Sequence, residues 1–195
     1  MVSVGDAYCV DRYEASRPDA TATDSGSDES RATSRAGVLP WETTNASAEA
    51  ACRAAGKALC TAQQWQCACE GAAKTTYSYG DSYEPKTCNG IDTFCSCDKA
   101  CSTLPECPFA GCYHQCGADF HLLPTGSMAG CVSPEGAFDL NGNVWEHVRG
   151  GSAKTVRGGA FNCGNSLKLH RCDYIPGDWA PSARGFRCCL IPGSP

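Results

Sequence analysis

The sequence predicts one α+β domain with little regular secondary structure, held together by disulfide bonds. The chain has 17 cysteines among 195 residues, and helix-like patterns are confined to its first part. After Gly71 the composition shifts to Gly, Pro, Asn, Asp, Ser and Cys, and no periodic segment exceeds a few residues. Because the chain is long enough for one sizeable core but not for two, we assign residues 1–195 to a single domain.

The cysteine content indicates an oxidising compartment, since the thiols of cytosolic proteins stay reduced. The alternative is a zinc-rich intracellular protein, but zinc modules repeat C-x2-C pairs, and this sequence contains none. Disulfides are therefore the preferred interpretation. On that basis we expect a secreted or periplasmic protein. No charged and then apolar segment precedes "VSVGDAYC", so we expect its signal to be absent from this chain.

The charge balance argues against nucleic acid as a partner. The net charge is −5 and charged residues make up 19% of the chain, so nothing steers the protein towards phosphate backbones or an anionic membrane surface. No apolar run approaches the roughly 20 residues that a membrane-spanning helix needs. We therefore predict neither a nucleic-acid partner nor a membrane span.

The first elements follow in order along the chain. "AYCVDRYEAS" alternates apolar and polar residues, which predicts a short strand. Residues 17–35 are rich in Ser, Thr, Asp and Ala and nearly free of large apolar side chains, so they predict a long, mobile surface loop.

Two helices are predicted next. "NASAEAACRAAGKALC" is Ala-rich, has cap candidates in Asn45 and Ser47 and a stop at Gly56, which predicts a helix of about three turns. Asn45 also begins a glycosylation sequon, but a helix start is the preferred interpretation. Thr61 and Gln64 form a capping-box pattern for a second helix that ends at Gly71.

The segment 95–116 holds six cysteines, "CSCDKACSTLPECPFAGCYHQC", without helical or strand periodicity. We interpret it as a disulfide-stapled insertion. The alternative is a soft-metal site in which cysteine thiolates act together with His114.

The run "FDLNGNVWEH" is the most informative short motif. Its opening resembles an EF-hand loop, but Val144 stands where that loop needs Gly and Gly150 where it needs Glu, which excludes an EF-hand. What remains is a turn that presents Asp139 and Glu146 with backbone carbonyls between them. This set suits a hard cation such as Ca²⁺, and the alternative is a plain Asx-rich turn.

Five motifs occur in the order and rough spacing of the formylglycine-generating enzyme family, also called the sulfatase-modifying-factor domain. They are "GKALCTAQQWQCAC", "YSYG", "NGNVWEH", "RGGAF" and "GFRCC". Each motif is weak alone, but five in order are specific. The chain resembles this family from about Tyr8 to Cys189, which is nearly its whole length.

The resemblance implies a variant of the C-type-lectin-like fold, stabilised by disulfides and calcium. It implies two bridges, Cys52–Cys188 and Cys69–Cys172. The family's calcium ligands fall on Asp139, Gly142, Val144 and Glu146, and a second calcium site maps near Asn89 and Asp119.

The family's enzymes oxidise a substrate cysteine to formylglycine with O₂, at a Cu(I) ion held by two cysteine thiolates. The first copper ligand falls on Cys163. The second position holds Lys168, an amine that does not replace a thiolate for Cu(I). The position of the active-site serine holds Ala160, so two of the three signature groups are absent.

Two histidines offer a rebuilt site. His170 follows Cys163 by seven residues, and His147 replaces a tryptophan that usually follows the family's "NVWE". A Cys/His copper or iron site is chemically reasonable, but such histidines are more often solvated or packed in the core. The candidate catalytic residues are therefore Cys163 and His170.

The odd number of cysteines leaves at least one without an intrachain disulfide partner, and Cys163 is our first choice for it. Cys9–Cys189 and Cys88–Cys131 are hypothesised as further bridges, within a total of about eight.

These arguments lead to a secreted, calcium- and disulfide-stabilised domain with a degenerate copper site. We expect it to bind a peptide, glycan or protein partner in a groove around Cys163, Trp145 and the 17–35 loop. Lectin-type sugar binding through calcium is not supported, because the Glu-Pro-Asn and Gln-Pro-Asp tripeptides are missing. The alternative is a copper-dependent oxidoreductase that acts on a cysteine or peptide substrate through Cys163.

Overall fold

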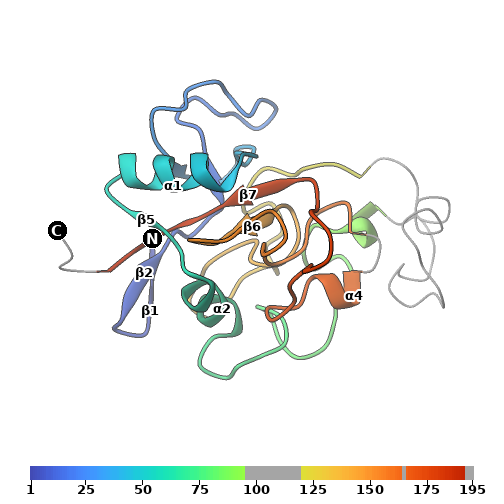
Figure 1. Cartoon of the computed structure of the whole chain (residues 1–195). Coiled ribbons are helices and arrows are strands. Elements are labelled where there is room, and N and C mark those ends of the chain that lie inside the picture. The colour runs from blue at the N-terminus through green and yellow to red at the C-terminus, as the bar shows by residue number, and fades with distance from the viewer. Residues whose placement is uncertain (95–119, 164–165, 192–195) are drawn as a thin grey trace.

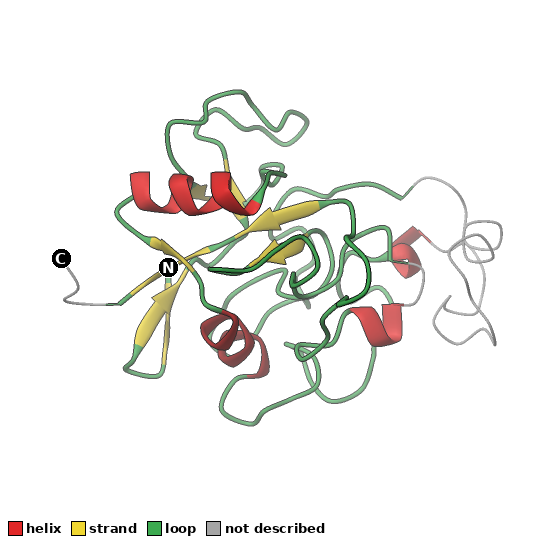
Figure 2. Cartoon of the chain, in the orientation of Figure 1, coloured by secondary structure: helices red, strands yellow, loops and turns green. Residues whose placement is uncertain are grey.

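The computed structural model describes residues 1–94, 120–163 and 166–191. The predicted insertion 95–116 and the predicted calcium ligand Asp119 lie outside the described residues. Short strands and three small sheets are joined by long loops, which form most of the described chain (Figure 2). No helix in the described ranges is long and apolar enough to cross a membrane.

The main sheet brings the two ends of the chain together. Its order is β1-β2-β8-β5, with β1 at Val2–Val4, β2 at Tyr8–Val10, β5 at Ala58–Leu59 and β8 at Cys188–Leu190, and every pairing is antiparallel. Two further pairs complete the strands. β3 (Ala15–Ser16) pairs with β4 (Thr33–Ser34), and β6 (Trp145–His147) runs parallel to β7 (Arg184–Phe186).

Two helices pack on opposite faces of this sheet (Figure 1). α1 (Asn45–Ala54) packs against Leu59 and Cys188, whereas α2 (Ala62–Glu70) packs against Val10 and Cys189. The alternation of side chains along β8 places neighbouring residues on opposite faces, which explains this division. Two shorter helices follow, a 3₁₀ helix at Ile91–Phe94 and α4 at Ser166–Leu169.

The helix starts test the predicted caps. The capping box of α2 is confirmed, because the Thr61 side chain accepts from Gln64 N and the Gln64 side chain accepts from Thr61 N. α1 begins one residue away from the predicted caps, since Thr44 accepts from Ser47 N. The side chain of Asn45 instead donates to Val148 O at 2.8 Å, a tertiary contact that no local pattern reveals.

The first predicted strand is two strands. β2 ends at Val10 and β3 starts at Ala15. Between the two strands, the side chains of Asp11 and Glu14 are buried. The 17–35 loop leaves from β3 and returns through β4. Its base is fixed by hydrogen bonds, such as Ala32 N to Ala51 O, and its rim by an Arg17–Glu29 ion pair of 2.7 Å. The mobility of the loop stays a prediction.

Four disulfides are present among the described residues. They are Cys52–Cys188, Cys60–Cys189, Cys69–Cys172 and Cys88–Cys131. The first and third are the two bridges that the resemblance implies. They join α1 and α2 to segments more than a hundred residues away in sequence, with separations of 136 and 103, and so fix both helices to the core.

The hypothesised Cys9–Cys189 bridge is wrong. Cys9 lies opposite Leu190 in the β2–β8 pair, and therefore on the other face of the sheet from Cys189. Cys189 is bonded instead to Cys60, at the end of β5. Cys9 and Cys67 carry free thiols, half-buried and exposed respectively.

Candidate functional site

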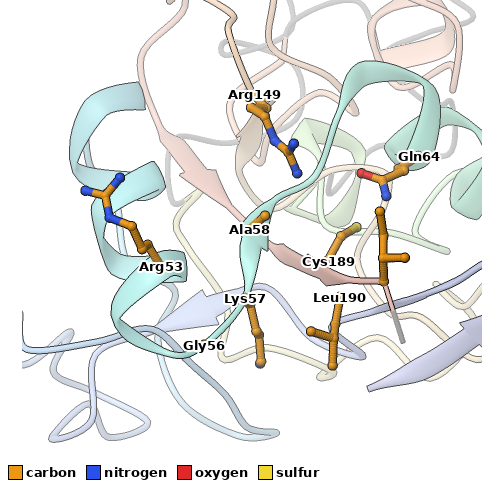
Figure 3. A pocket seen from close by; sticks show the side chains of 9 residues that line it. Arg53, Gly56, Lys57, Ala58, Gln64, Arg149, Cys189 and Leu190 are labelled. Carbon is orange, nitrogen blue, oxygen red and sulfur yellow. The ribbon is translucent and has the colours of Figure 1, made fainter. Parts of the chain in front are cut away.

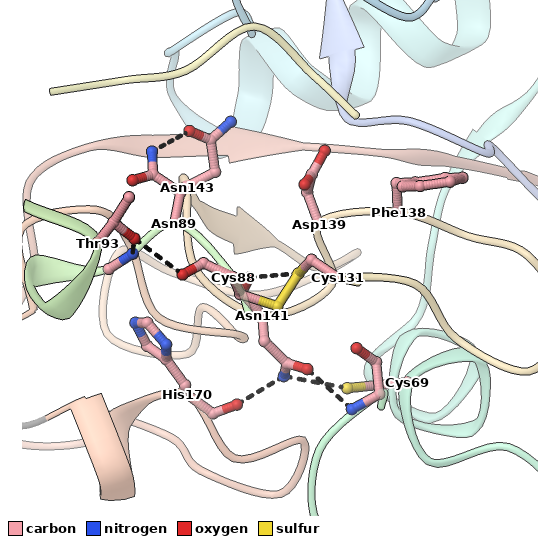
Figure 4. The surroundings of a disulfide bond; sticks show 12 residues. Cys69, Cys88, Asn89, Thr93, Cys131, Phe138, Asp139, Asn141, Asn143 and His170 are labelled. Carbon is pink, nitrogen blue, oxygen red and sulfur yellow. Dashed lines mark hydrogen bonds between the residues drawn. A yellow bond between two sulfur atoms is a disulfide. The ribbon is translucent and has the colours of Figure 1, made fainter. Parts of the chain in front are cut away.

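The turn that leads into β6 is the centre of the predicted calcium site. Asp139, Gly142 and Asn143 all have positive φ, of 56°, 78° and 57°. At Gly142 a side chain is also excluded by space, because a Cβ would lie 2.3 Å from Asn89 O. This conformation folds the turn onto Asn89, and Asn143 N donates to the same carbonyl at 2.8 Å. The side-chain amides of Asn89 and Asn143 are joined as well (Figure 4).

Glu146, the predicted acidic calcium ligand, is held by other groups. Arg187 Nη2 lies 2.6 Å from its Oε1, and Arg187 Nε and Trp65 Nε1 each donate to its Oε2 at 2.7 Å. All three side chains are fully buried. Both carboxylate oxygens are therefore engaged, and the guanidinium already supplies the positive charge beside them.

The other predicted members of this set are buried nearby. Asp139 Oδ2 accepts from Gly126 N at 2.6 Å. Gly142 N donates to Gly158 O at 2.8 Å, and Val144 N donates to Glu14 Oε1 at 3.2 Å. The carboxyl group of Glu14 thus enters the site, although the sequence indicated only a strand residue there.

Burial makes this cluster electrostatically unusual. Burial raises the pKa of Asp139 to about 6, with the charge of Glu146 adding to the effect, although the Gly126 N–H and Arg187 oppose it. Burial also raises the pKa of Glu14 well above its usual range, and the charges of Asp139 and Glu146 raise it further. Three carboxyls therefore face one guanidinium, and protonation relieves the excess negative charge.

Sequence reasoning missed both Glu14 and Arg187. The signal for Glu14 was an acidic residue in an otherwise half-apolar strand pattern, and the signal for Arg187 was a basic residue inside "GFRCC". Neither pattern identifies the group that the side chain contacts, because that group lies far away in the sequence.

Asn89, in the second predicted calcium set, has a buried amide oxygen. Its Nδ2 donates to His121 O at 3.1 Å and to Asn143 Oδ1 at 2.8 Å. Its Oδ1 has no hydrogen-bond partner among the described residues. An unpartnered buried acceptor of this kind suits a cation or a water molecule.

Cys163, the predicted copper ligand, is a buried thiol. Its Sγ accepts from Ala160 N at 3.0 Å, and it packs with Trp145, Val156 and Ala183. Burial raises the pKa of the Cys163 thiol to about 12, although the Ala160 N–H opposes this. The protonated thiol is therefore the stable form near neutral pH, whereas Cu(I) binds the thiolate.

His170, the second candidate catalytic residue, meets Cys163 at the same backbone position. Its Nε2 lies 3.3 Å from Ala160 O. A Cβ at Gly159 would lie only 2.1 Å from His170 Cδ2, so the imidazole packs directly on this turn. Burial lowers the pKa of His170 to about 4, against the opposing effects of the Ala160 carbonyl and of Asp92. Cys163 and His170 therefore both hydrogen-bond to the backbone of Ala160, Cys163 to its N–H and His170 to its carbonyl.

His147 is engaged elsewhere. Its Nε2 lies 3.0 Å from Thr43 O, and its Nδ1 is buried without a hydrogen-bond partner. Burial lowers its pKa, although the Thr43 carbonyl opposes this effect. Within the described residues, no group of three or more His, Cys, Asp and Glu side chains is arranged to hold a metal ion.

Lys168, at the position of the second copper ligand, lies over an aromatic ring. Its Nζ is 5.6 Å from the centroid of Tyr174. Beside it is a hollow of about 470 Å³ lined by Lys168, Arg171, Asp173, Tyr174 and Ile175. Ile175 and Trp179 are 45% and 41% exposed, and Trp179 contacts Trp145 edge to face at 5.8 Å. We call the group of Lys168, Arg171, Asp173, Tyr174, Ile175 and Trp179 the α4 surface.

The predicted groove does not include the 17–35 loop. The loop lies over α1, at the top of Figure 1, whereas α4 lies at the lower right. The hydrogen bond from Ala32 N to Ala51 O holds the loop to α1. The prediction that the loop and Cys163 share one groove is therefore wrong, because a backbone hydrogen bond holds the loop against α1 and not against α4.

Comparison with known families gives one match. The model of the sulfatase-modifying factor enzyme 1-like domain matches residues 11–190. Among solved structures, one titled "Crystal Structure of CarF" is similar at 17% sequence identity and a TM-score of 0.47, covering 98% of this chain and 76% of that one. No curated protein sequence gives a significant match.

Proposed function

Because the chain belongs to the family of sulfatase-modifying factor enzyme 1-like domains, we propose that it is a binding domain of the formylglycine-generating type whose copper site is degenerate. The observation that carries this proposal is the state of Cys163. Cys163 is the one remaining signature group, a buried thiol packed with Trp145, Val156 and Ala183. The position of the second thiolate holds Lys168, whereas the copper site of the family needs two thiolates.

The neighbours of Cys163 support the same proposal. Ala160 offers backbone groups but no side-chain hydroxyl, and its N–H donates to the sulfur. Lys168 stands at the sequence position where the family has a second thiolate, and its ammonium lies over the Tyr174 ring. An amine does not replace a thiolate as a ligand for Cu(I).

The α4 surface is the proposed binding surface for a peptide, glycan or protein partner. Ile175 is exposed and lines the hollow together with Lys168 and Arg171, and exposed Trp179 packs on Trp145. Arg171 is paired with Asp173 at 2.8 Å, which neutralises its charge. Aromatic and arginine side chains are enriched at recognition surfaces because they combine apolar area with directed hydrogen bonds. The disulfides are consistent with an oxidising compartment, and we propose secretion or a periplasmic location on that basis.

A copper-dependent oxidoreductase is the second candidate. The observation that favours it is that Cys163 and His170 both hydrogen-bond to the backbone of Ala160. These two residues would hold the ion, which when bound supplies the activation of O₂. His170 would donate as a neutral imidazole, because burial lowers its pKa to about 4.

One experiment separates the two candidates. Cu(I) is titrated anaerobically into two variants. The first carries Cys9→Ser and Cys67→Ser, which removes two other thiols, and the second carries Cys163→Ser in addition. A binding domain predicts the same Cu(I) affinity with and without Cys163. Tight Cu(I) binding that is lost in Cys163→Ser would establish the oxidoreductase instead.

Calcium forms a separate part of the proposal. The set of Asp139, Gly142, Val144 and Glu146 does not fit the ion as it is arranged, because Arg187 and Trp65 occupy the Glu146 carboxylate. The second predicted set fits better, since the buried Oδ1 of Asn89 has no hydrogen-bond donor among the described residues. We therefore propose Ca²⁺ at that set, near Asn89 and Asp119, of which the structure describes Asn89. Thermal unfolding with Ca²⁺, with Mg²⁺ and with EDTA tests this, and a melting temperature that Ca²⁺ does not raise would contradict it.

We also propose that the chain has the C-type-lectin-like fold variant and that residues 1–195 form one domain. Few helices, small sheets and many loops support it, since that fold was expected to be poor in regular secondary structure.

A further inference from the structure

A second hollow lies away from the α4 surface, between α1, β5 and β8 (Figure 3). Its volume is about 410 Å³. The residues that line it are Arg53, Gly56, Lys57, Ala58, Gln64, Arg149, Cys189, Leu190 and Ile191. None of them lines the hollow of the α4 surface, so any ligand here extends the proposed function beyond that surface.

The charge of this lining is one-sided. Three lining residues are basic and none is acidic, in a chain whose net charge is −5. Lys57 is neutralised, because its Nζ lies 2.6 Å from the buried Asp11 carboxylate. Arg53 and Arg149 are exposed, and within the described ranges neither takes part in an ion pair.

Arg149 is held in place while its charged end stays available. Its backbone N donates to Cys60 O at 2.8 Å, and its Nε donates to Leu59 O at 3.2 Å. In Figure 3 the guanidinium and the Gln64 amide both extend towards the strand that carries Ala58, above Cys189. Gln64 is fixed as well, because its Oε1 accepts from Thr61 N at 2.9 Å. Its amide nitrogen therefore points away from the capping box.

The other end of the hollow is apolar. Leu190 is half-buried, and Ile191 is 49% exposed. The Cys60–Cys189 disulfide lies between this apolar end and Arg149, and it fixes β5 to β8. The hollow therefore offers a positively charged end and an apolar end on a cross-linked, rigid base.

We propose that this hollow docks an acidic segment of a partner protein, with one carboxylate on Arg149 and the Gln64 amide and an apolar side chain on Leu190 and Ile191. Arg149 can bind a carboxylate through two parallel hydrogen bonds, which gives both strength and direction. Arg53 adds positive charge at the rim, which speeds association with an acidic partner more than it tightens the complex.

The test uses a peptide with fluorescein on its N-terminal amine, fluorescein-Glu-Leu-Glu-Leu-Glu-amide, and the matched peptide in which every Glu is Gln. Fluorescence anisotropy gives the affinity of the intact protein for each. We expect the acidic peptide to bind and the Gln peptide to bind at least about tenfold more weakly, as for the loss of a charge-assisted hydrogen bond. Higher salt concentration weakens the acidic complex.

Variants locate the binding. Arg149→Gln is expected to lower the affinity for the acidic peptide at least about tenfold, whereas Arg149→Lys retains the charge and part of the affinity. The control is Arg31→Gln, an exposed arginine of the 17–35 loop. Thermal unfolding of each variant shows that the fold is intact, which keeps loss of binding distinct from loss of structure.

Three results would overturn the proposal: equal affinity for the Glu and Gln peptides, no effect of Arg149→Gln, or no binding of the acidic peptide. Tighter binding of a heparin-derived oligosaccharide than of the peptide at the same residues would overturn the choice of a protein partner. The Cu(I) titration on Cys163 is independent of all these outcomes, so failure here leaves the proposed function untouched.

Discussion

Arg187 and Glu146 form a fully buried ion pair, with Nη2 2.6 Å from Oε1. Arg187 also donates to the carbonyls of Asp11 and Phe138, at 3.1 and 2.8 Å. One side chain therefore connects the β2–β3 segment, the 138–146 turn and the C-terminal strands. It takes a position beside the carboxylate that the family resemblance had assigned to calcium.

Removing either partner of this pair is expected to be strongly destabilising. Arg187→Met leaves three carboxyls without their cation, and Glu146→Gln leaves a buried guanidinium without its carboxylate. Either loss costs about 3–5 kcal/mol of unfolding free energy. Urea unfolding measures it. The double variant, Arg187→Met with Glu146→Gln, is expected to lose less than the sum of the two single losses, and a fully additive double variant would contradict the pairing.

Stability is expected to fall as the pH rises from about 4 to about 6. The folded pKa of Asp139 is raised to about 6 by burial, from an ordinary value of 3.8, so between these values the native state binds more protons than the unfolded state. The stabilisation from the Asp139 proton is complete below the lower value and lost above the upper one. Glu14 contributes with the same sign, because its pKa is also raised.

The measurement is urea unfolding across this pH range, with Asp139→Asn for comparison. The slope is at most about 1.4 kcal/mol per pH unit for each proton involved. Asp139→Asn is expected to flatten it. A stability that rises with pH over the same range in the intact protein would show that the buried carboxyls are ionised throughout.

Gly142→Ala is expected to destabilise the protein through a clash with Asn89. Gly142 and Gly37 have nearly equal positive φ, of 78° and 75°. A Cβ at Gly142 would lie 2.3 Å from Asn89 O, whereas at Gly37 nothing lies within 4 Å. Gly37→Ala therefore measures backbone strain alone, about 1 kcal/mol. Thermal unfolding of Gly142→Ala should show a clearly larger loss, and equal losses would mean that the turn moves freely.

Thiol labelling is expected to follow exposure and pKa. Cys67 is exposed and Cys9 half-buried, whereas Cys163 is buried and its pKa is raised to about 12 by burial. Because the thiolate is the reacting form, iodoacetamide at neutral pH should modify Cys67 first and Cys163 only after unfolding. Peptide mapping by mass spectrometry reads the order. Rapid labelling of Cys163 in the folded protein would point to an accessible, reactive site.

Much of the local structure could be predicted from the sequence. The capping box of Thr61 and Gln64 and the stop at Gly71 define α2, because a helix end depends on residues within one turn of it. The order of five short motifs was enough to identify the family. Ala160 and Lys168 stand at the two positions where the family resemblance implies a serine and a second copper thiolate, and this difference could be read from the sequence alone.

The partners of buried groups were decided only by the tertiary structure. Val144 N and the Glu14 carboxylate are 130 residues apart in sequence and 3.2 Å apart in space, and no local pattern encodes such a pair. The choice of Cys60 rather than Cys9 for Cys189 depends on which face of β8 each side chain occupies. The sequence by itself therefore determined which chemical groups the protein has. Folding decided which of them meet and how far each is removed from water, and these two quantities set the protonation of Cys163, Asp139 and Glu14.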